Sequence, residues 1–165
     1  MRVIGIDASL RSTGIGVVES QGSRLKAVEF STVRNPASLS HSECLRRILG
    51  ELGAVMDRCK PQAAAIEGGF YCKNARTALV LGEVRGVVIA ASASAGIPIY
   101  EYSPRLVKQA LTGFGAAQKD QVSKMVKVIL GTSGEIQEDA ADALAIAICH
   151  LQSQTGIAEL RPKPI

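Results

Sequence analysis

Four acidic residues, far apart along the chain, occupy positions from which their carboxylates could meet. Asp7 ends the apolar run 3–6, and Glu67 ends a second apolar run, 63–66, so each can project from the end of a strand. Asp139 and Asp142 fall in a segment that predicts the first turn of a helix, where residues three apart share one face. Clustered oxygen ligands suit Mg²⁺ or Mn²⁺, which activate water and stabilise phosphoryl transfer. The pattern therefore predicts a metal centre for phosphodiester chemistry.

Each of these residues also has a plainer interpretation. Acids in the first turn of a helix complement the helix dipole, which would explain Asp139. Asp142 is harder to explain in this way, because it lies among apolar residues and would be costly to bury unpaired. Glu67 could be a solvated strand end. Glu101, between two tyrosines near another strand end, is a similar candidate that no further pattern supports.

Composition indicates a basic chain that could bind a polyanion. The 165 residues are 47% hydrophobic and 21% charged, which suits one domain with its own core. The formal charge of +4 favours a partner such as nucleic acid, although a basic surface alone is weak evidence. The four cysteines form no CxxC pair, so reduced thiols in a cytoplasmic protein are expected. The apolar stretch 87–99 is too short to span a bilayer, and no membrane association is expected.

Hydrophobic periodicity predicts an ordered series of strands and helices. Three strands come first, and a helix capped by Ser40 and Glu43 follows them. Ser103 and Pro104 are typical of the start of a later helix. The expected strands are 3–6, 14–18, 25–33, 62–67 and 97–102, and the expected helices are 45–56, 74–93, 104–111, 118–130 and 138–151.

Three meandering strands followed by alternating helices and strands predict an α/β fold. An antiparallel portion continued by parallel crossovers is the ribonuclease-H-like arrangement, a mixed five-stranded sheet of order 3-2-1-4-5 flanked by helices. That order makes the strands ending at Asp7 and Glu67 neighbours, and the last helix could bring Asp139 and Asp142 to the same sheet end. We expect one domain over residues 1–152 and a flexible tail over 153–165.

Short motifs spread in order along the chain carry a resemblance to a known family. They are Gly5-Ile-Asp7, Arg11 with Thr13-Gly14 and Gly16, Ala65-Ile-Glu67 with Phe70, Lys73-Asn74-Ala75, Leu81-Gly82, Arg85-Gly86, Val107-Lys108-Gln109 and Asp139-Ala-Ala-Asp142 with the residues 143–147. With these motifs the chain resembles the bacterial Holliday-junction resolvases of the RuvC family over about residues 2–152. It departs from the family pattern at residues 8–10 and at Gly68-Gly69, which affects the local loops but removes no acidic residue.

The resemblance implies a structure-selective endonuclease that resolves four-way DNA junctions as a homodimer. It implies Mg²⁺ as cofactor, with Mn²⁺ as a substitute, and a branch-migration motor of the RuvA and RuvB type as partner. The implied catalytic and metal-binding residues are Asp7, Glu67, Asp139 and Asp142. The implied DNA contacts are Lys108, Lys119 and a base-stacking wedge at Phe70. Arg11 and Lys73 flank the acidic centre in sequence and are weaker candidates for phosphate contacts.

Several alternatives remain open on the sequence. Phe70 could be a core residue, and an individual lysine is most often merely solvated. A non-catalytic junction-binding protein of the same fold is the main functional alternative, and loss of an acidic residue would be its signature. An actin-like ATPase would need phosphate-binding glycines after Asp7 and a longer chain, and Gly113 to Lys119 lacks the Gly-Lys-Ser/Thr ending of a phosphate loop. Gly82 and Gly86, one turn apart in an apolar helix, favour self-association.

Overall fold

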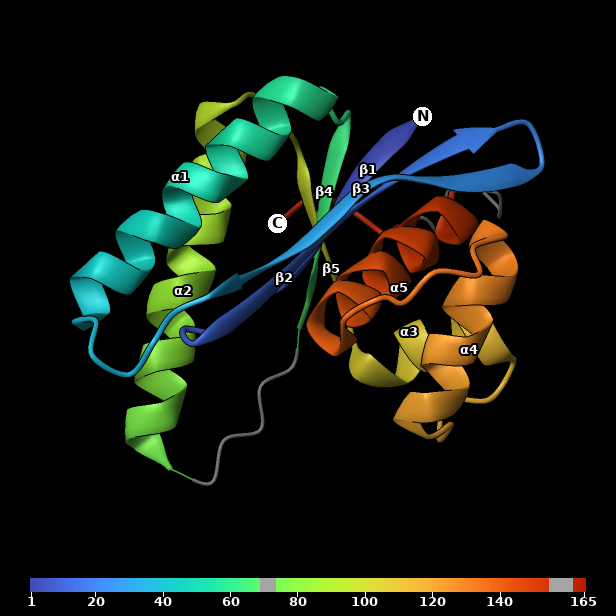
Figure 1. The fold of residues 1–165 in the computed structure, drawn as a ribbon. Coiled ribbons are helices and arrows are strands. Elements are labelled where there is room, and N and C mark those ends of the chain that lie inside the picture. The colour runs from blue at the N-terminus through green and yellow to red at the C-terminus, as the bar shows by residue number, and fades with distance from the viewer. Residues whose placement is uncertain (69–73, 155–161) are drawn as a thin grey trace.

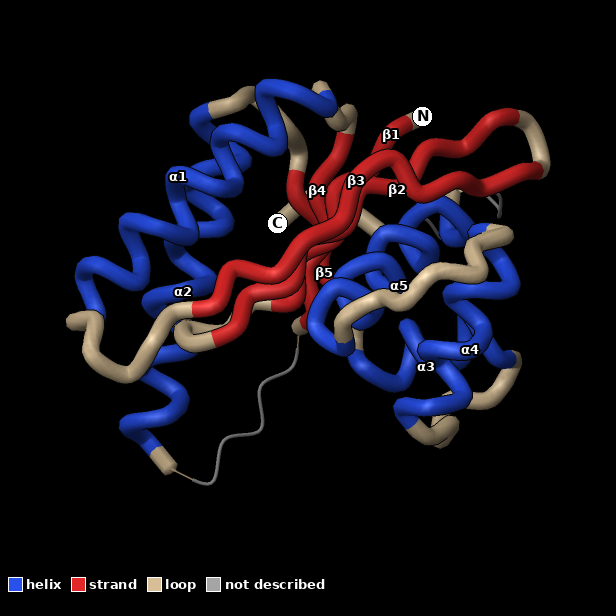
Figure 2. Tube along the Cα trace, viewed as in Figure 1, coloured by secondary structure: helices blue, strands red, loops and turns tan. Residues whose placement is uncertain are grey.

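A five-stranded sheet lies between two layers of helices in the computed structural model, which describes residues 1–68, 74–154 and 162–165 (Figure 1). The strands are β1 (Arg2–Asp7), β2 (Ser12–Gln21), β3 (Arg24–Arg34), β4 (Ala63–Glu67) and β5 (Ile99–Tyr102). The helices are α1 (His41–Cys59), α2 (Ala75–Ser94), α3 (Pro104–Thr112), α4 (Lys119–Leu130) and α5 (Glu138–Ser153). Helices α1 and α2 cover one face, and α3, α4 and α5 cover the other (Figure 2).

The strand order is β3-β2-β1-β4-β5, which confirms the predicted ribonuclease-H-like arrangement. Strands β1, β2 and β3 pair antiparallel, whereas β4 pairs parallel to both β1 and β5. The second strand is longer than the predicted 14–18, because its pairing with β3 continues as far as Gln21 opposite Arg24. Polar residues extend this hairpin, and the apolar run alone could not mark its end.

The predicted helix starts at Ser40 and Ser103 are confirmed. The Ser40 hydroxyl accepts from the Glu43 N–H at 3.4 Å, and the Glu43 carboxylate accepts from the Ser40 N–H at 2.8 Å, which completes a capping box. The Ser103 hydroxyl accepts from the Leu106 N–H at 3.3 Å, with Pro104 as the first residue of α3. These bonds fix where α1 and α3 leave the sheet.

Side chains alternate between two cores along β1. Ile4 and Ile6 pack toward α1 and α2, while Val3 packs on the face covered by α5. Asp7 shares the face of Val3, because the two residues are separated by an even number of positions. Helix α5 is buried over most of its length and carries many alanines, so its backbone can lie close to the strands.

Three glycines let α5 touch the sheet directly. Gly5 and Gly16 lie opposite one another in the β1–β2 register, and Gly14 lies opposite Asp7. A Cβ atom on Gly14 would overlap the carbonyl oxygen of Asp139, and one on Gly5 would overlap that of Ala143. One on Gly16 would lie 2.8 Å from the backbone nitrogen of Leu144. These three glycines form a glycine surface on β1 and β2, which sets how closely the backbone of α5 packs against the sheet.

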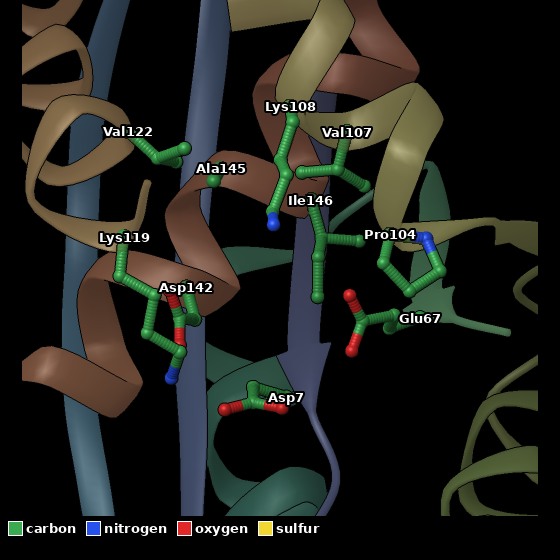
Figure 3. A pocket seen from close by; sticks show the side chains of 10 residues that line it. All are labelled: Asp7, Glu67, Pro104, Val107, Lys108, Lys119, Val122, Asp142, Ala145 and Ile146. Atoms are coloured by element: carbon green, nitrogen blue, oxygen red, sulfur yellow. The ribbon is translucent and has the colours of Figure 1, made fainter. Parts of the chain in front are cut away.

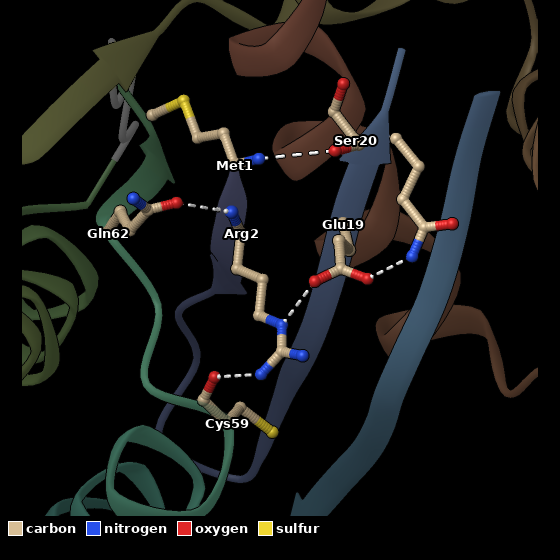
Figure 4. Close-up of polar contacts among 7 residues, drawn as sticks. Met1, Arg2, Glu19, Ser20, Cys59 and Gln62 are labelled. Carbon is tan, nitrogen blue, oxygen red and sulfur yellow. Dashed lines mark hydrogen bonds and ion pairs between the residues drawn. The ribbon is translucent and has the colours of Figure 1, made fainter. Parts of the chain in front are cut away.

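Arg2 joins three elements at the start of β1 (Figure 4). Its Nε donates to Glu19 Oε1 of β2 at 2.7 Å, and its Nη1 donates to the carbonyl oxygen of Cys59 at 2.9 Å. Its backbone N–H donates to Gln62 Oε1 at 3.0 Å. These contacts fix the lateral position of β1 between β2 and β4 at the sheet end opposite Asp7.

The buried side chain of His150 joins α5 to β5. Its Nδ1 lies 2.7 Å from the Tyr102 hydroxyl, and burial lowers the pKa of His150 to about 4. The neutral ring also lies against Tyr100, with ring centroids 4.5 Å apart. This contact holds the C-terminal half of α5 in place, while the glycines hold its N-terminal half.

Replacing Gly14 with alanine should destabilise the fold, because the new methyl group would meet the backbone of α5, which no side-chain rotation can relieve. We expect a loss of about 1–3 kcal/mol in the free energy of unfolding, measured by chemical denaturation. Gly50 on α1 is the matched control, because nothing lies within 4 Å of a Cβ there. Gly50→Ala should stabilise the protein by roughly 0.5–1 kcal/mol. Equal effects of the two substitutions would show that α5 does not rest on Gly14.

Candidate active site

A cavity of about 150 Å³ opens where β1 and β4 end, between α3, α4 and α5 (Figure 3). Three carboxylates and two ammonium groups line it: Asp7, Glu67, Asp142, Lys108 and Lys119. Apolar side chains form the rest of its wall: Pro104, Val107, Val122, Ala145 and Ile146. The cavity brings together five of the residues that the sequence singled out.

Strand pairing places Asp7 beside Glu67. Ile6 and Ile66 are partners in the parallel β1–β4 register, so the next residue of each strand emerges at the same sheet end. Asp142 joins them from the second turn of α5, because the glycine surface of β1 and β2 lets the helix approach. Lys119 begins α4 and Lys108 lies on α3, so five elements that are far apart in the sequence contribute to one cavity.

Asp139 lies one turn before Asp142 and outside the lining of the cavity. Its Oδ2 accepts a hydrogen bond of 2.5 Å from the hydroxyl of Ser12, the first residue of β2. The negative charge of Asp139 nevertheless reaches Asp7 and contributes to the raised pKa of that residue. No sequence pattern marks Ser12, because only the β2–α5 packing brings it to Asp139.

The carboxylates repel one another inside a partly buried site. Burial, followed by the charges of Asp142, Glu67 and Asp139, raises the pKa of Asp7 to about 7. Burial is also the main cause that raises the pKa of Glu67 and that of Asp142. The site therefore carries negative charge that the neighbouring residues neutralise only in part.

Two lysines offset part of this charge. Lys119 Nζ lies 3.2 Å from Asp142 Oδ2 and 3.2 Å from Glu138 Oε1, and the attraction of Asp142 raises the pKa of Lys119 above its ordinary range. Lys108 and Lys119 both act to lower the pKa of Glu67. In Figure 3, Lys108 reaches the cavity from α3 and Lys119 reaches it from α4. Both ammonium groups face the space that the carboxylates border.

The donor set fits a hard divalent cation. In the described part of the chain, no three His, Cys, Asp or Glu side chains are grouped closely enough to hold an ion as they stand. Asp142 is paired with Lys119, and Asp139 accepts a hydrogen bond from Ser12. Burial and then the repulsion of neighbouring carboxylates raise the pKa of Asp7, and bound Mg²⁺ or Mn²⁺ would offset both effects. Carboxylate oxygens are also the ligands that these ions prefer.

The other predicted DNA-binding residue that the structure describes, Arg11, does not line this cavity. Arg11 turns away from it: its Nη1 donates to the carbonyl oxygens of Pro36 at 2.8 Å and Leu39 at 3.1 Å. Its role here is to hold the segment before α1. Phe70 and Lys73 lie outside the described residues.

The fold and the cavity define the class of protein. A 3-2-1-4-5 mixed sheet with carboxylates at the ends of its central parallel strands is that of the ribonuclease-H-like nucleases. Residues 3–150 match the model of the family described as "Crossover junction endodeoxyribonuclease RuvC". The chain belongs to the RuvC family.

Relatives cover nearly all of the chain. A crossover junction endodeoxyribonuclease RuvC of Syntrophomonas wolfei is 46% identical over 154 residues, which are 93% of this chain and 90% of the relative. That of Pelotomaculum thermopropionicum is 42% identical over 164 residues, covering 99% of this chain and all of the relative. A structure of Thermus thermophilus RuvC in complex with a Holliday junction substrate is 34% identical, with a TM-score of 0.92 over 100% of this chain and 99% of that one.

Removal of the Asp7 charge should stabilise the metal-free protein at high pH. The pKa of Asp7 is about 7 in the fold and near 3.8 when unfolded, so the folded chain binds more protons between these values. The contribution of Asp7 to stability is therefore greatest below its unfolded pKa and is lost as the pH rises toward 7. In EDTA at pH 8, Asp7→Asn should raise the free energy of unfolding by about 1–4 kcal/mol, and the gain should shrink toward pH 5.

The matched control is Asp120→Asn, because that carboxylate on α4 is 65% exposed and should change stability little at either pH. Added Mg²⁺ should stabilise the wild-type protein at pH 8 and stabilise Asp7→Asn much less. Denaturation curves at the two pH values measure both effects. An Asp7→Asn variant with the same pH dependence as the wild type would contradict the electrostatic description of the site.

Proposed function

We propose that this protein is a structure-selective endodeoxyribonuclease that resolves four-way DNA junctions by metal-dependent hydrolysis of phosphodiester bonds. The observation that carries the proposal is the convergence of Asp7, Glu67 and Asp142 with two lysines on one cavity in a chain of the RuvC family. The printed description of the Thermus thermophilus relative, in complex with a Holliday junction substrate, supports the choice of DNA.

Each residue of the site has a distinct role in this proposal. Asp7, Glu67 and Asp142 hold Mg²⁺, for which Mn²⁺ can substitute, and Asp139 completes the set from the edge of the cavity. The bound ion supplies Lewis acidity and a water molecule of lowered pKa. Lys108 and Lys119 place positive charge beside the phosphate and stabilise the negative charge that develops on its oxygens. Lys119 also fixes the Asp142 carboxylate through its ion pair.

The alternative is a junction-binding protein of the same fold that does not cut. The set of four acids is complete in this chain, and burial and mutual repulsion keep the pKa of Asp7 far above its ordinary value. Such an arrangement is destabilising unless a cation offsets it, which favours the catalytic function over binding alone.

Asp7→Asn, Glu67→Gln and Asp142→Asn should each abolish cutting of a synthetic four-way junction and leave junction binding largely intact. The carboxylates serve the metal, whereas lysines and arginines supply the affinity for phosphates. Cutting is measured with and without Mg²⁺, and a linear duplex tests selectivity. We expect a loss of at least about 100-fold in rate for each variant. Asp139→Asn should follow the same direction.

Asp120→Asn serves as the matched control, because it removes one carboxylate of α4 that is paired with Lys124 and does not line the active-site cavity. It should cut at the wild-type rate. Wild-type cutting by one of the three cavity variants would remove that residue from the site. A wild-type protein that binds four-way junctions but does not cut them with Mg²⁺ or Mn²⁺ would establish the non-catalytic alternative instead.

We also infer that the protein is a homodimer with α2 at its two-fold axis. Helix α2 is apolar along most of its length, yet only Val84, Val88, Ala91 and Ser92 of its side chains are buried. Leu79 is 67% exposed, and nothing lies within 4 Å of a Cβ on Gly82 or Gly86. A second copy of α2 could approach closely along this side, and two-fold symmetry would place two active sites for paired cuts.

The length and composition of α2 also satisfy the criteria for a membrane span. Its place in the fold opposes that interpretation. Val84 and Val88 are fully buried in the core shared with α1 and the sheet, and Arg85 forms an ion pair of 2.5 Å with Glu101 of β5. Insertion into a bilayer would break this core, whereas pairing with another protein surface would preserve it.

Gly86→Leu should weaken the dimer, because the leucine side chain would stand where two backbones approach. The measurement is the mass by light scattering across a micromolar concentration series. Gly50→Leu is the matched control, since Gly50 is an exposed helix glycine on α1 that also has open space around it. It should leave the mass unchanged. A single-chain mass for the wild type at micromolar concentration would contradict the dimer.

The family resemblance supports two further parts of the proposal: a cytoplasmic location and a branch-migration motor of the RuvA and RuvB type as partner. The wedge role of Phe70 and the phosphate contact by Lys73 stay predictions. Phe70→Ala tests the wedge, because it should slow cutting of intact junctions and leave the denaturation midpoint unchanged.

A further inference from the structure

A second hollow adjoins the active-site cavity. It is a groove of about 560 Å³ between α3 and the loop 113–116, and it shares Pro104 and Lys108 with the cavity. The rest of its lining is Arg105, Gln109, Gly113, Phe114, Gly115 and Ala116. A polymer chain that extends from the cavity past Lys108 would therefore continue directly into this groove.

Phe114 is held on the surface at the far side of the groove. Helix α3 ends at Gly113, whose φ of 76° turns the chain and whose N–H donates to the Gln109 carbonyl. The Thr112 hydroxyl donates to the Lys108 carbonyl at 2.8 Å and accepts from the Phe114 N–H at 3.1 Å. These bonds fix the backbone, yet the Phe114 side chain is 63% exposed. A large aromatic ring is thus presented outward from a fixed loop.

The ring of Phe114 stands between two hollows. On one side it lines the groove beside Lys108, and on the other it lines a depression formed with Thr112, Ala117, Gln121, Lys124 and Met125. A planar group could therefore stack against the ring from the groove without displacing any part of the fold. Stacking on an aromatic side chain is how proteins hold single bases without regard to their identity.

The groove carries the positive charges of Arg105 and Lys108. Neither Arg105 nor Lys108 forms an ion pair with another residue in the part of the chain that the structure describes, whereas Lys119 and Lys124 do. The stem of Arg105 packs on the loop, since a Cβ on Gly115 would lie 2.7 Å from Arg105 Cγ. Among the described residues that line the groove there is no carboxylate. Unpaired cations beside an exposed aromatic ring are suited to a nucleic-acid strand.

We propose that this groove binds the DNA strand next to the scissile phosphate, with one base stacked on Phe114 and the neighbouring phosphates held by Arg105 and Lys108. The proposal rests on the proposed function and extends it, because it names the path of the strand beyond the cavity. Phe114 is a binding residue in this description and takes no part in the chemistry.

The test uses four-way junctions that carry 2-aminopurine at successive positions near the cut, bound in Ca²⁺ so that the DNA stays intact. One position should change its fluorescence on binding to the wild type, and Phe114→Ala should abolish that change. Phe114→Ala should also weaken junction binding about 5- to 100-fold, and Phe114→Tyr should restore it. Arg105→Gln should lower the slope of log affinity against log salt by about one.

Val128→Ala is the control for loss of an exposed apolar group, because Val128 on α4 is 71% exposed and borders a different hollow. Arg46→Gln on α1, across the sheet, is the control for loss of a charge. Both should retain wild-type binding and fluorescence. Circular dichroism melts confirm that each variant folds.

The proposal would be overturned if Phe114→Ala bound junctions with wild-type affinity and gave the wild-type fluorescence change. That result is also the one expected if Phe114 contacts a protein partner instead of DNA. If Phe114→Ala gives that result and the wild type still cuts junctions in Mg²⁺, only the proposed strand-binding groove is contradicted. If the wild type does not cut, the proposed function fails as well.

Discussion

The contact between α5 and the glycine surface of β1 and β2 is the constraint on which the site depends. Asp7 and Glu67 would meet wherever β1 and β4 pair in this register, but Asp142 reaches them only if α5 lies against the strands. Backbone carbonyls of α5 occupy the space where Cβ atoms would stand on Gly5 and Gly14. The same packing that buries the alanines of α5 therefore sets the spacing of the carboxylates.

This packing also creates the electrostatic character of the site. Burial is the largest cause of the raised pKa of Asp7, and the repulsion of the neighbouring carboxylates adds to it. The lysines relieve it incompletely, because Lys119 is shared between Asp142 and Glu138. The fold thus stores an unfavourable interaction at one end of the sheet, which a divalent cation would convert into a favourable one. The clustered carboxylates that the proposed reaction needs therefore lower the stability of the fold.

The sequence predicted the sheet order and the main members of the site, because both follow from local patterns. Apolar runs that end in an acid marked Asp7 and Glu67, and the order of elements made their strands neighbours. Contacts that depend on three-dimensional packing were not predictable in this way. Ser12 meets Asp139 across 127 residues, and the Arg11 guanidinium donates to the carbonyl oxygen of Pro36 before α1. The phosphate contact of Arg11 stays a prediction. The division into a domain over 1–152 and a flexible tail over 153–165 stays a prediction.

The central claim is that the packing of α5 assembles one cation site from carboxylates of three elements. Anomalous X-ray scattering from crystals grown with Mn²⁺ tests it most directly, because it locates the ion without reference to activity. The account predicts a manganese peak in the cavity, coordinated by Asp7 together with Glu67 or Asp142. A protein that crystallises in this fold with manganese bound elsewhere, or with no peak beside Asp7 at millimolar Mn²⁺, would contradict it.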